Sequence, residues 1–208
     1  MVPESVRIAF RKVGSLQFIS HLDLMRTMKK VFIRSGIPVW YSEGFNPHPK
    51  MVFALPLSIG TESVCEKMDI KLRRSMPFDE IRCRLNAALT PELQVDEVYA
   101  PQSKFSSIRW AQYRVTYETD VSAASSLFAQ SYKIMKHTKS GEAEIDIVPL
   151  IRSIAFSENH ADMILDAGST SYLNPEYVAR AVAAFCNAPD YSILRQEIFF
   201  EDGVTPFR

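Results

Sequence analysis

Apolar and polar residues alternate between residues 5 and 12, and this two-residue period predicts a half-buried strand. Residues 21–35 instead repeat apolar side chains every three or four positions, which predicts an amphipathic helix. Ser20 is a favourable N-cap and Asp23 follows three residues later, as in a capping box, so the helix is expected to begin at residue 21. Gly36 is expected to end it.

The rest of the first half continues with two strands, a helix and a strand, over residues 51–57, 66–73, 77–89 and 93–99. The order βαββαβ is typical of the ferredoxin-like sandwich, in which a four-stranded antiparallel sheet carries both helices on one face. The second half repeats this order with an inserted hairpin: 108–119, 122–131, the hairpin 132–137 and 143–148 turning at 139–141, 154–157, 162–166, 175–186 and 192–200.

The sequence therefore predicts an α+β protein of two tandem ferredoxin-like sandwiches with antiparallel sheets. Residues 1–100 form the first domain and residues 108–208 the second. Between them, residues 100–107 are polar, contain a proline and lack periodicity, so they are expected to form a linker.

The composition, with 47% hydrophobic and 23% charged residues among 208, is ordinary for a soluble globular protein. No apolar run is long enough to span a membrane and no secretory signal is evident, so we expect a cytoplasmic protein without a membrane partner. Cys65, Cys83 and Cys186 have no metal-binding spacing. We accordingly expect neither a metal site nor a cofactor.

The net charge is zero, but residues 1–50 carry eight basic groups against three acidic ones. On the predicted helix, Arg26, Lys30 and Arg34 are four residues apart and share one side. Arg7 and Arg11 are expected on the sheet face that the helices leave open. Both surfaces could contact the phosphates of a nucleic acid.

Residues 44–50 contain two prolines, which exclude a regular helix or a central strand and predict a stiff loop. This loop presents Phe45, Asn46, His48 and Lys50 to a phosphate, a base edge or a partner peptide. The alternative is a rigid connector with Phe45 packed into the core. We expect the loop to lie at the opposite end of the sheet from His21.

Several blocks of the sequence resemble a family of uncharacterised bacterial proteins described as radical-SAM-linked or radical-SAM-associated. The resemblance rests on residues 10–14 (FRKVG), 18–26 (FISHLDLMR), 42–50 (SEGFNPHPK), 56–60 (PLSIG) and 66–70 (EKMDI), and less strongly on 141–147 and 174–176. It implies association with a radical-SAM protein, often near genes for RNA processing. The cysteine triplet that holds the cluster of such enzymes is absent, so the chemistry would reside on a separate polypeptide.

The function we favour is a non-catalytic accessory protein that binds tRNA or rRNA, docks to a radical-SAM partner, or does both. One alternative is an endoribonuclease similar to the repeat-processing enzymes of CRISPR systems, with His21 as acid or base and Lys50 or Arg26 stabilising the phosphorane. The C-terminal loop has only one glycine, unlike the glycine-rich loop of those enzymes. Another alternative is a protein-interaction subunit that never touches RNA.

Overall fold

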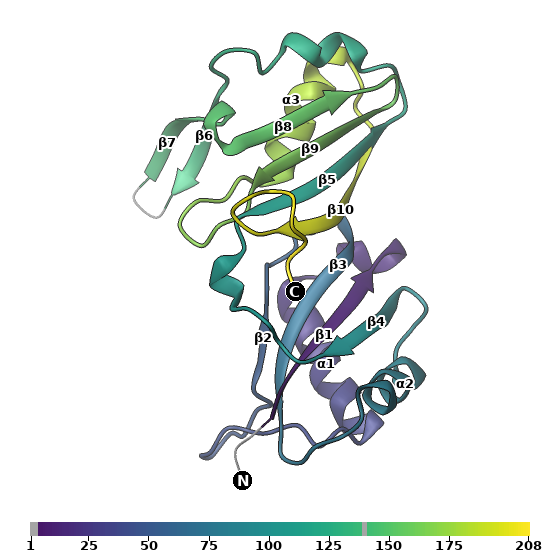
Figure 1. The fold of residues 1–208 in the computed structure, drawn as a ribbon. Helices are drawn as coiled ribbons and strands as arrows, with labels where there is room; N and C mark the ends of the chain where they lie inside the picture. Colours follow the sequence, from purple (N-terminus) through teal and green to yellow (C-terminus); the bar gives the residue numbers. More distant parts are fainter. Residues whose placement is uncertain (1–3, 139–140) are drawn as a thin grey trace. The chain divides into compact units, whose positions relative to one another are not determined.

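The computed structural model describes residues 4–138 and 141–208, which divide into two compact units. Unit 1 comprises the chain up to Phe105 together with Arg208, and unit 2 comprises Ser106–Phe207. Figure 1 shows the course of the chain through these units. A short 3-10 turn, Phe105–Ser107, lies where the chain passes from the first unit to the second.

Unit 1 contains a four-stranded antiparallel sheet with the strand order β4-β1-β3-β2. Both of its helices contribute buried side chains to one core beneath this sheet. Its elements in chain order are β1 (Glu4–Lys12), the 3-10 helix η1 (Gly14–Phe18), α1 (His21–Ser35), β2 (Met51–Phe53), β3 (Thr61–Leu72), α2 (Phe78–Ala88) and β4 (Leu93–Tyr99).

Helix α1 begins and ends where the sequence predicts. The Ser20 side chain accepts a hydrogen bond from the Asp23 N–H at 3.1 Å, which satisfies one of the free donors of the first turn. Gly36 takes the left-handed conformation with φ 65°, which a residue with a side chain adopts only under strain. Leu24, Met28 and Phe32 bury the apolar face of the helix against the sheet.

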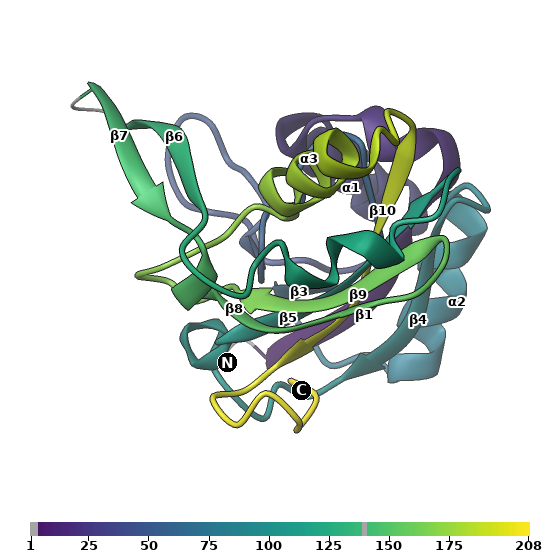
Figure 2. The ribbon, with the colours of Figure 1, turned by 90° about the horizontal axis from the view of Figure 1, so that it is seen from above.

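Unit 2 has a second antiparallel sheet with the strand order β10-β5-β9-β8, and α3 covers one of its faces (Figure 2). A separate hairpin of β6 and β7 extends away from this sheet. The elements in chain order are β5 (Trp110–Tyr117), η3 (Ser122–Ser126), β6 (Lys133–Thr138), β7 (Gly141–Asp146), η4 (Val148–Leu150), β8 (Ile151–Phe156), β9 (His160–Asp166), α3 (Pro175–Cys186) and β10 (Tyr191–Phe199).

These elements confirm an α+β protein with antiparallel sheets, and they correct two local predictions. The helix predicted over residues 122–131 is only the five-residue 3-10 helix η3, because its serines compete for backbone hydrogen bonds and favour turns. Strand β2 stops at Phe53, ahead of Pro56, and is shorter than predicted. Residues 139 and 140 of the predicted hairpin turn lie outside the described residues. No described helix combines the length and apolarity needed to cross a membrane.

Candidate functional site

Unit 1 carries a groove of about 810 Å³ on the face of its sheet opposite the helices. Three stretches of chain form it: the end of the proline loop with β2, the outward-facing residues at the ends of β1 and β3, and the segment 101–105. Its lining residues are Ser5, His48, Pro49, Lys50, Met51, Val52, Asp69, Ile70, Lys71, Pro101, Gln102, Ser103, Lys104 and Phe105.

The pairing register of β2 on β3 fixes which side chains face this groove. Val52 lies opposite Asp69, and both line the groove, whereas the neighbouring Phe53 lies opposite the fully buried Met68 of the core. Because successive side chains of a strand point to opposite faces, the groove and the helix-covered core are on opposite sides of the same sheet.

Lys50, Lys71 and Lys104 come from three separate parts of the chain and line the groove together. All three are exposed, and among residues 4–138 and 141–208 none of them forms an ion pair. The one carboxylate of the lining, Asp69, is bound by the Arg7 guanidinium at 2.7 Å and 2.8 Å. The groove therefore carries three positive charges that no carboxylate in the described part of the chain neutralises by an ion pair.

Arg7 is on the predicted sheet face but is fully buried, so it is not a surface cation. Its guanidinium also donates to the Ser103 carbonyl at 2.8 Å and lies 4.3 Å from the centre of the Phe105 ring. The segment that the sequence assigns to a linker thus covers Arg7. We conclude that Arg7 supports the groove from beneath and does not reach a ligand.

Residues 38–50 form a closed hairpin rather than an irregular loop. Ser42 and His48 are joined by three contacts: the Ser42 N–H donates to the His48 carbonyl at 2.8 Å, the His48 N–H donates to Ser42 Oγ at 3.1 Å, and Oγ lies 2.9 Å from His48 Nδ1. The Lys50 N–H donates to the Trp40 carbonyl at 2.9 Å. One arm of this hairpin is a wall of the groove.

The tip of this hairpin, residues 43–47, is exposed throughout. Phe45 is fully exposed, so the alternative in which it packs into the core is wrong. Asn46 is also exposed, and its carbonyl lies 3.3 Å from His48 Nδ1. The proline-containing loop therefore exposes the Phe45 ring to solvent at the tip of a hairpin that the Ser42–His48 hydrogen bonds close.

His21 lies on the helix side of the sheet. Its ring packs edge-on against Phe53, with 5.0 Å between ring centres, and Phe53 in turn contacts the core residue Phe10. His21 also borders a narrow crevice with Lys12, whose ammonium group donates to the Leu16 carbonyl at 3.1 Å. The structure does not bring His21 together with His48 or Lys50, which line the groove on the other face.

The basic side of α1 is partly occupied by its own neighbours. Arg26 forms an ion pair with Asp23 at 2.9 Å, and Arg34 donates to the Ala88 carbonyl at 2.7 Å. Hydrogen bonds from Ser20 and Arg26 lower the pKa of Asp23, which keeps this carboxylate charged. Lys30 is exposed. Arg26, Lys30 and Arg34 form the basic stripe of α1, and of these three cations Lys30 alone is fully available, because the other two are already bound.

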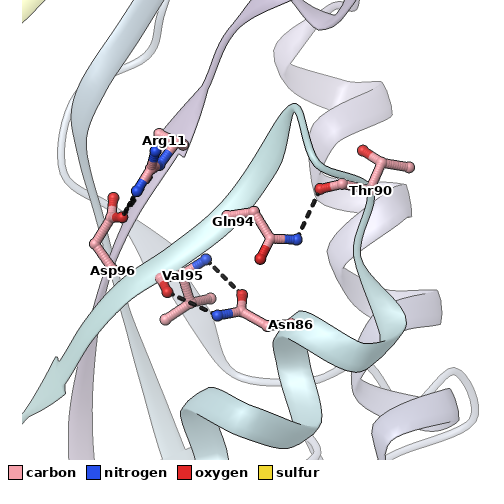
Figure 3. A network of polar contacts seen from close by, with 6 residues as sticks. All are labelled: Arg11, Asn86, Thr90, Gln94, Val95 and Asp96. Atoms are coloured by element: carbon pink, nitrogen blue, oxygen red, sulfur yellow. Dashed lines mark hydrogen bonds and ion pairs between the residues drawn. The ribbon is translucent and has the colours of Figure 1, made fainter.

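Arg11 is engaged as well. Its guanidinium donates to Asp96 of β4, with 3.1 Å from Nε to the carboxylate (Figure 3). This hydrogen bond and the carboxylate charge raise the pKa of Arg11. The same strand is tied to α2 by Asn86, which exchanges two hydrogen bonds with the backbone of Val95. Arg11 thus belongs to the β1–β4 edge and not to the groove.

Lys104 and Phe105 could not be recognised as groove residues from the sequence, because both lie in a stretch without periodicity that is typical of a linker. A lysine followed by an aromatic residue in an otherwise small and polar segment was the available signal. Among the described residues no group of three His, Cys, Asp or Glu side chains could hold a metal ion.

These features define a two-unit α+β protein with a cationic groove on the open sheet face of its first unit. A family model described as "Uncharacterized protein conserved in bacteria (DUF2344)" matches residues 5–175. The chain therefore belongs to this family. The search of curated proteins found no match.

Proposed function

We propose that this protein is a non-catalytic accessory protein that binds RNA, a tRNA or an rRNA, in the groove of unit 1. The observation that carries the proposal is the convergence of Lys50, Lys71 and Lys104, which lack ion pairs among the described residues, on one groove. Exposed lysines without acidic neighbours attract phosphates, and each phosphate contact releases a condensed counterion.

Nearby groups favour RNA over a single small anion. The groove is lined by the apolar side chains of Val52 and Phe105 as well as by lysines. Proteins that bind single strands combine a positively charged groove with apolar or aromatic surfaces for the bases. Arg7 neutralises Asp69, so that this carboxylate repels a phosphate less than an unpaired one would.

The wider setting of this function is also a proposal. We propose a cytoplasmic protein whose partner is a separate radical-SAM protein, as the sequence resemblance implies. We further propose that both units are ferredoxin-like. The strand order β4-β1-β3-β2 in unit 1 and the corresponding order β10-β5-β9-β8 in unit 2 support this assignment.

Replacing Lys50, Lys71 and Lys104 together by Gln tests the proposal. We expect the variant to bind bulk tRNA or rRNA fragments more weakly, and the magnitude of the negative slope of log K against log salt to decrease by about 2, since each contacted phosphate contributes about 0.7. The matched control replaces Arg82, Arg84 and Arg180 by Gln, which removes the same charge from α2 and α3.

The control should keep the slope of the unaltered protein. Equal losses in both variants would mean that only net charge matters, and this would contradict the groove as the site. An absence of RNA binding by the unaltered protein, with capture of a protein partner, would favour the protein-interaction subunit instead.

A histidine-assisted endoribonuclease is the second candidate. It is favoured by the crevice that Lys12 and His21 both line, since a lysine near a histidine can stabilise charge during phosphoryl transfer. However, the crevice is too narrow to admit water, and Lys50 is on the other face of the sheet. We therefore rank this candidate below the accessory protein.

A further inference from the structure

We infer that the groove takes an unpaired stretch of RNA and that Phe45 stacks on one of its bases, an inference that rests on the proposed function. The phosphates would lie against the three groove lysines, and one base beside the groove would lie against the Phe45 ring. Duplex RNA would be a poor ligand for the same surface.

The hairpin presents the Phe45 side chain to solvent. A fully exposed Phe side chain leaves in water an apolar surface whose burial is favourable. A mobile loop could fold the ring back, but here the Ser42–His48 contacts close the hairpin below the tip, and Pro47 restricts the tip itself. Because the backbone that carries Phe45 is already ordered, stacking of the ring on a base costs less entropy than it would in an unconstrained loop.

The tip of the hairpin lies close to the groove. His48, Pro49 and Lys50 form a wall of the groove, and Phe45 precedes His48 by three residues. The extended chain spans at most roughly 10 Å over that distance. A strand of RNA whose phosphates lie along this wall would therefore bring a neighbouring base within reach of the ring.

The size and chemistry of the groove also suit an unpaired strand. A volume of about 810 Å³ is typical of clefts that enclose small ligands, so it suits one or two nucleotides. Stacking also requires bases whose faces are accessible, and these occur in single strands, loops and bulges, whereas a duplex keeps its bases stacked on each other. An acidic peptide would neutralise the lysines but would leave the Phe45 ring without a planar partner.

The test uses the full chain and a fluorescein-labelled 12-nucleotide oligo(A) RNA, a duplex of the same length, and poly-glutamate as an acidic polypeptide. We expect the single strand to bind at least tenfold more tightly than the duplex. Phe45→Ala should weaken single-strand binding by about 5-fold to 150-fold, the range that corresponds to one lost stack, and leave the salt slope unchanged. Phe45→Trp should retain binding.

Phe18→Ala is the matched control, because Phe18 is also an exposed phenylalanine of unit 1 but lies on η1. It should bind like the unaltered protein, and both alanine variants should melt as the unaltered protein does. Equal binding of single strand and duplex, or no effect of Phe45→Ala while the lysine variant still loses RNA, would overturn the inference and leave the proposed function standing. Binding of poly-glutamate without any RNA binding would overturn both.

Discussion

Arg7 and Asp69 determine the charge at the base of the groove. The guanidinium has no exposed surface and donates two parallel hydrogen bonds to the carboxylate, whose side chain keeps 27% of its surface exposed. A bidentate pair of this kind is geometrically specific and would be costly to break, because either charge alone would be desolvated without a partner. Arg7 therefore holds the segment at Ser103 and Phe105 in place. Because the pair is neutral, the lysines make the net charge of the groove positive.

Lys12 and Gly14, both in the sequence block of residues 10–14, have clear structural roles. The Lys12 ammonium group binds the carbonyls of Leu16 and Gln17 at the end of η1. Gly14 has φ 62°, and a Cβ there would lie 2.2 Å from the Glu92 carboxylate, which accepts a hydrogen bond from the Ser15 N–H. Both residues shape the turn that leads into α1 and so position His21.

We predict that His21→Ala affects stability and leaves RNA binding intact. The ring is half-buried and its edge contacts Phe53, so its loss should lower the free energy of unfolding by about 1 kcal/mol. RNA affinity should stay unchanged because the groove is on the other face of the sheet. Urea denaturation and RNA titration measure the two effects. If the unaltered protein cleaved RNA and the variant did not, the enzyme hypothesis would replace ours.

Among the elements, the hairpin of residues 38–50 and helix α1 carry the predicted binding residues on different sides of one sheet. The hairpin is anchored on β3, since the Trp40 N–H donates to the Lys71 carbonyl at 2.7 Å and the Arg73 N–H donates to the Pro38 carbonyl at 2.8 Å. These bonds place Lys50 in the same groove as Lys71. Helix α1, by contrast, packs its buried face on the core and keeps its basic stripe away from the groove.

The helix stripe gives a quantitative prediction. Replacing Arg26, Lys30 and Arg34 by Gln should reduce the magnitude of the salt slope of RNA binding by no more than about 0.7–0.9, which is the contribution of a single phosphate contact. Two of the three side chains already bind Asp23 and Ala88, so only Lys30 is fully available. Titration at several salt concentrations measures the slope. A decrease near 2–3 would show that all three cations contact phosphates and that α1 is a second RNA surface.

For the whole molecule, the important feature is that every residue lining the groove belongs to unit 1. Unit 1 has its own core of side chains from both helices and three strands, with Met28, Ile70 and Leu85 among its fully buried members. A unit with a separate core can fold independently of the rest of its chain. Unit 2 would then bind a different partner, and its projecting β6–β7 hairpin is available for such a contact.

We predict that a fragment of residues 1–105 folds cooperatively and binds unpaired RNA with the salt slope of the full chain. The physical reason is that it retains the groove lysines, the closed hairpin and the segment over Arg7. Thermal melting by circular dichroism checks the fold, and anisotropy titration checks binding. A folded fragment without RNA affinity would show that unit 2 supplies part of the binding surface.

The α+β class, the order of the strands, and the limits of α1 could be predicted from the sequence, because periodicity, caps and prolines act over a few residues. The two prolines of residues 44–50 also indicated a stiff loop, without deciding whether its side chains are exposed. Only the tertiary structure decided that Arg7 is buried, that Phe45 is exposed, and that Lys50, Lys71 and Lys104 share one groove. Those outcomes depend on which strands pair and on what covers each sheet face, and such contacts join residues too far apart in the chain for any local pattern to encode.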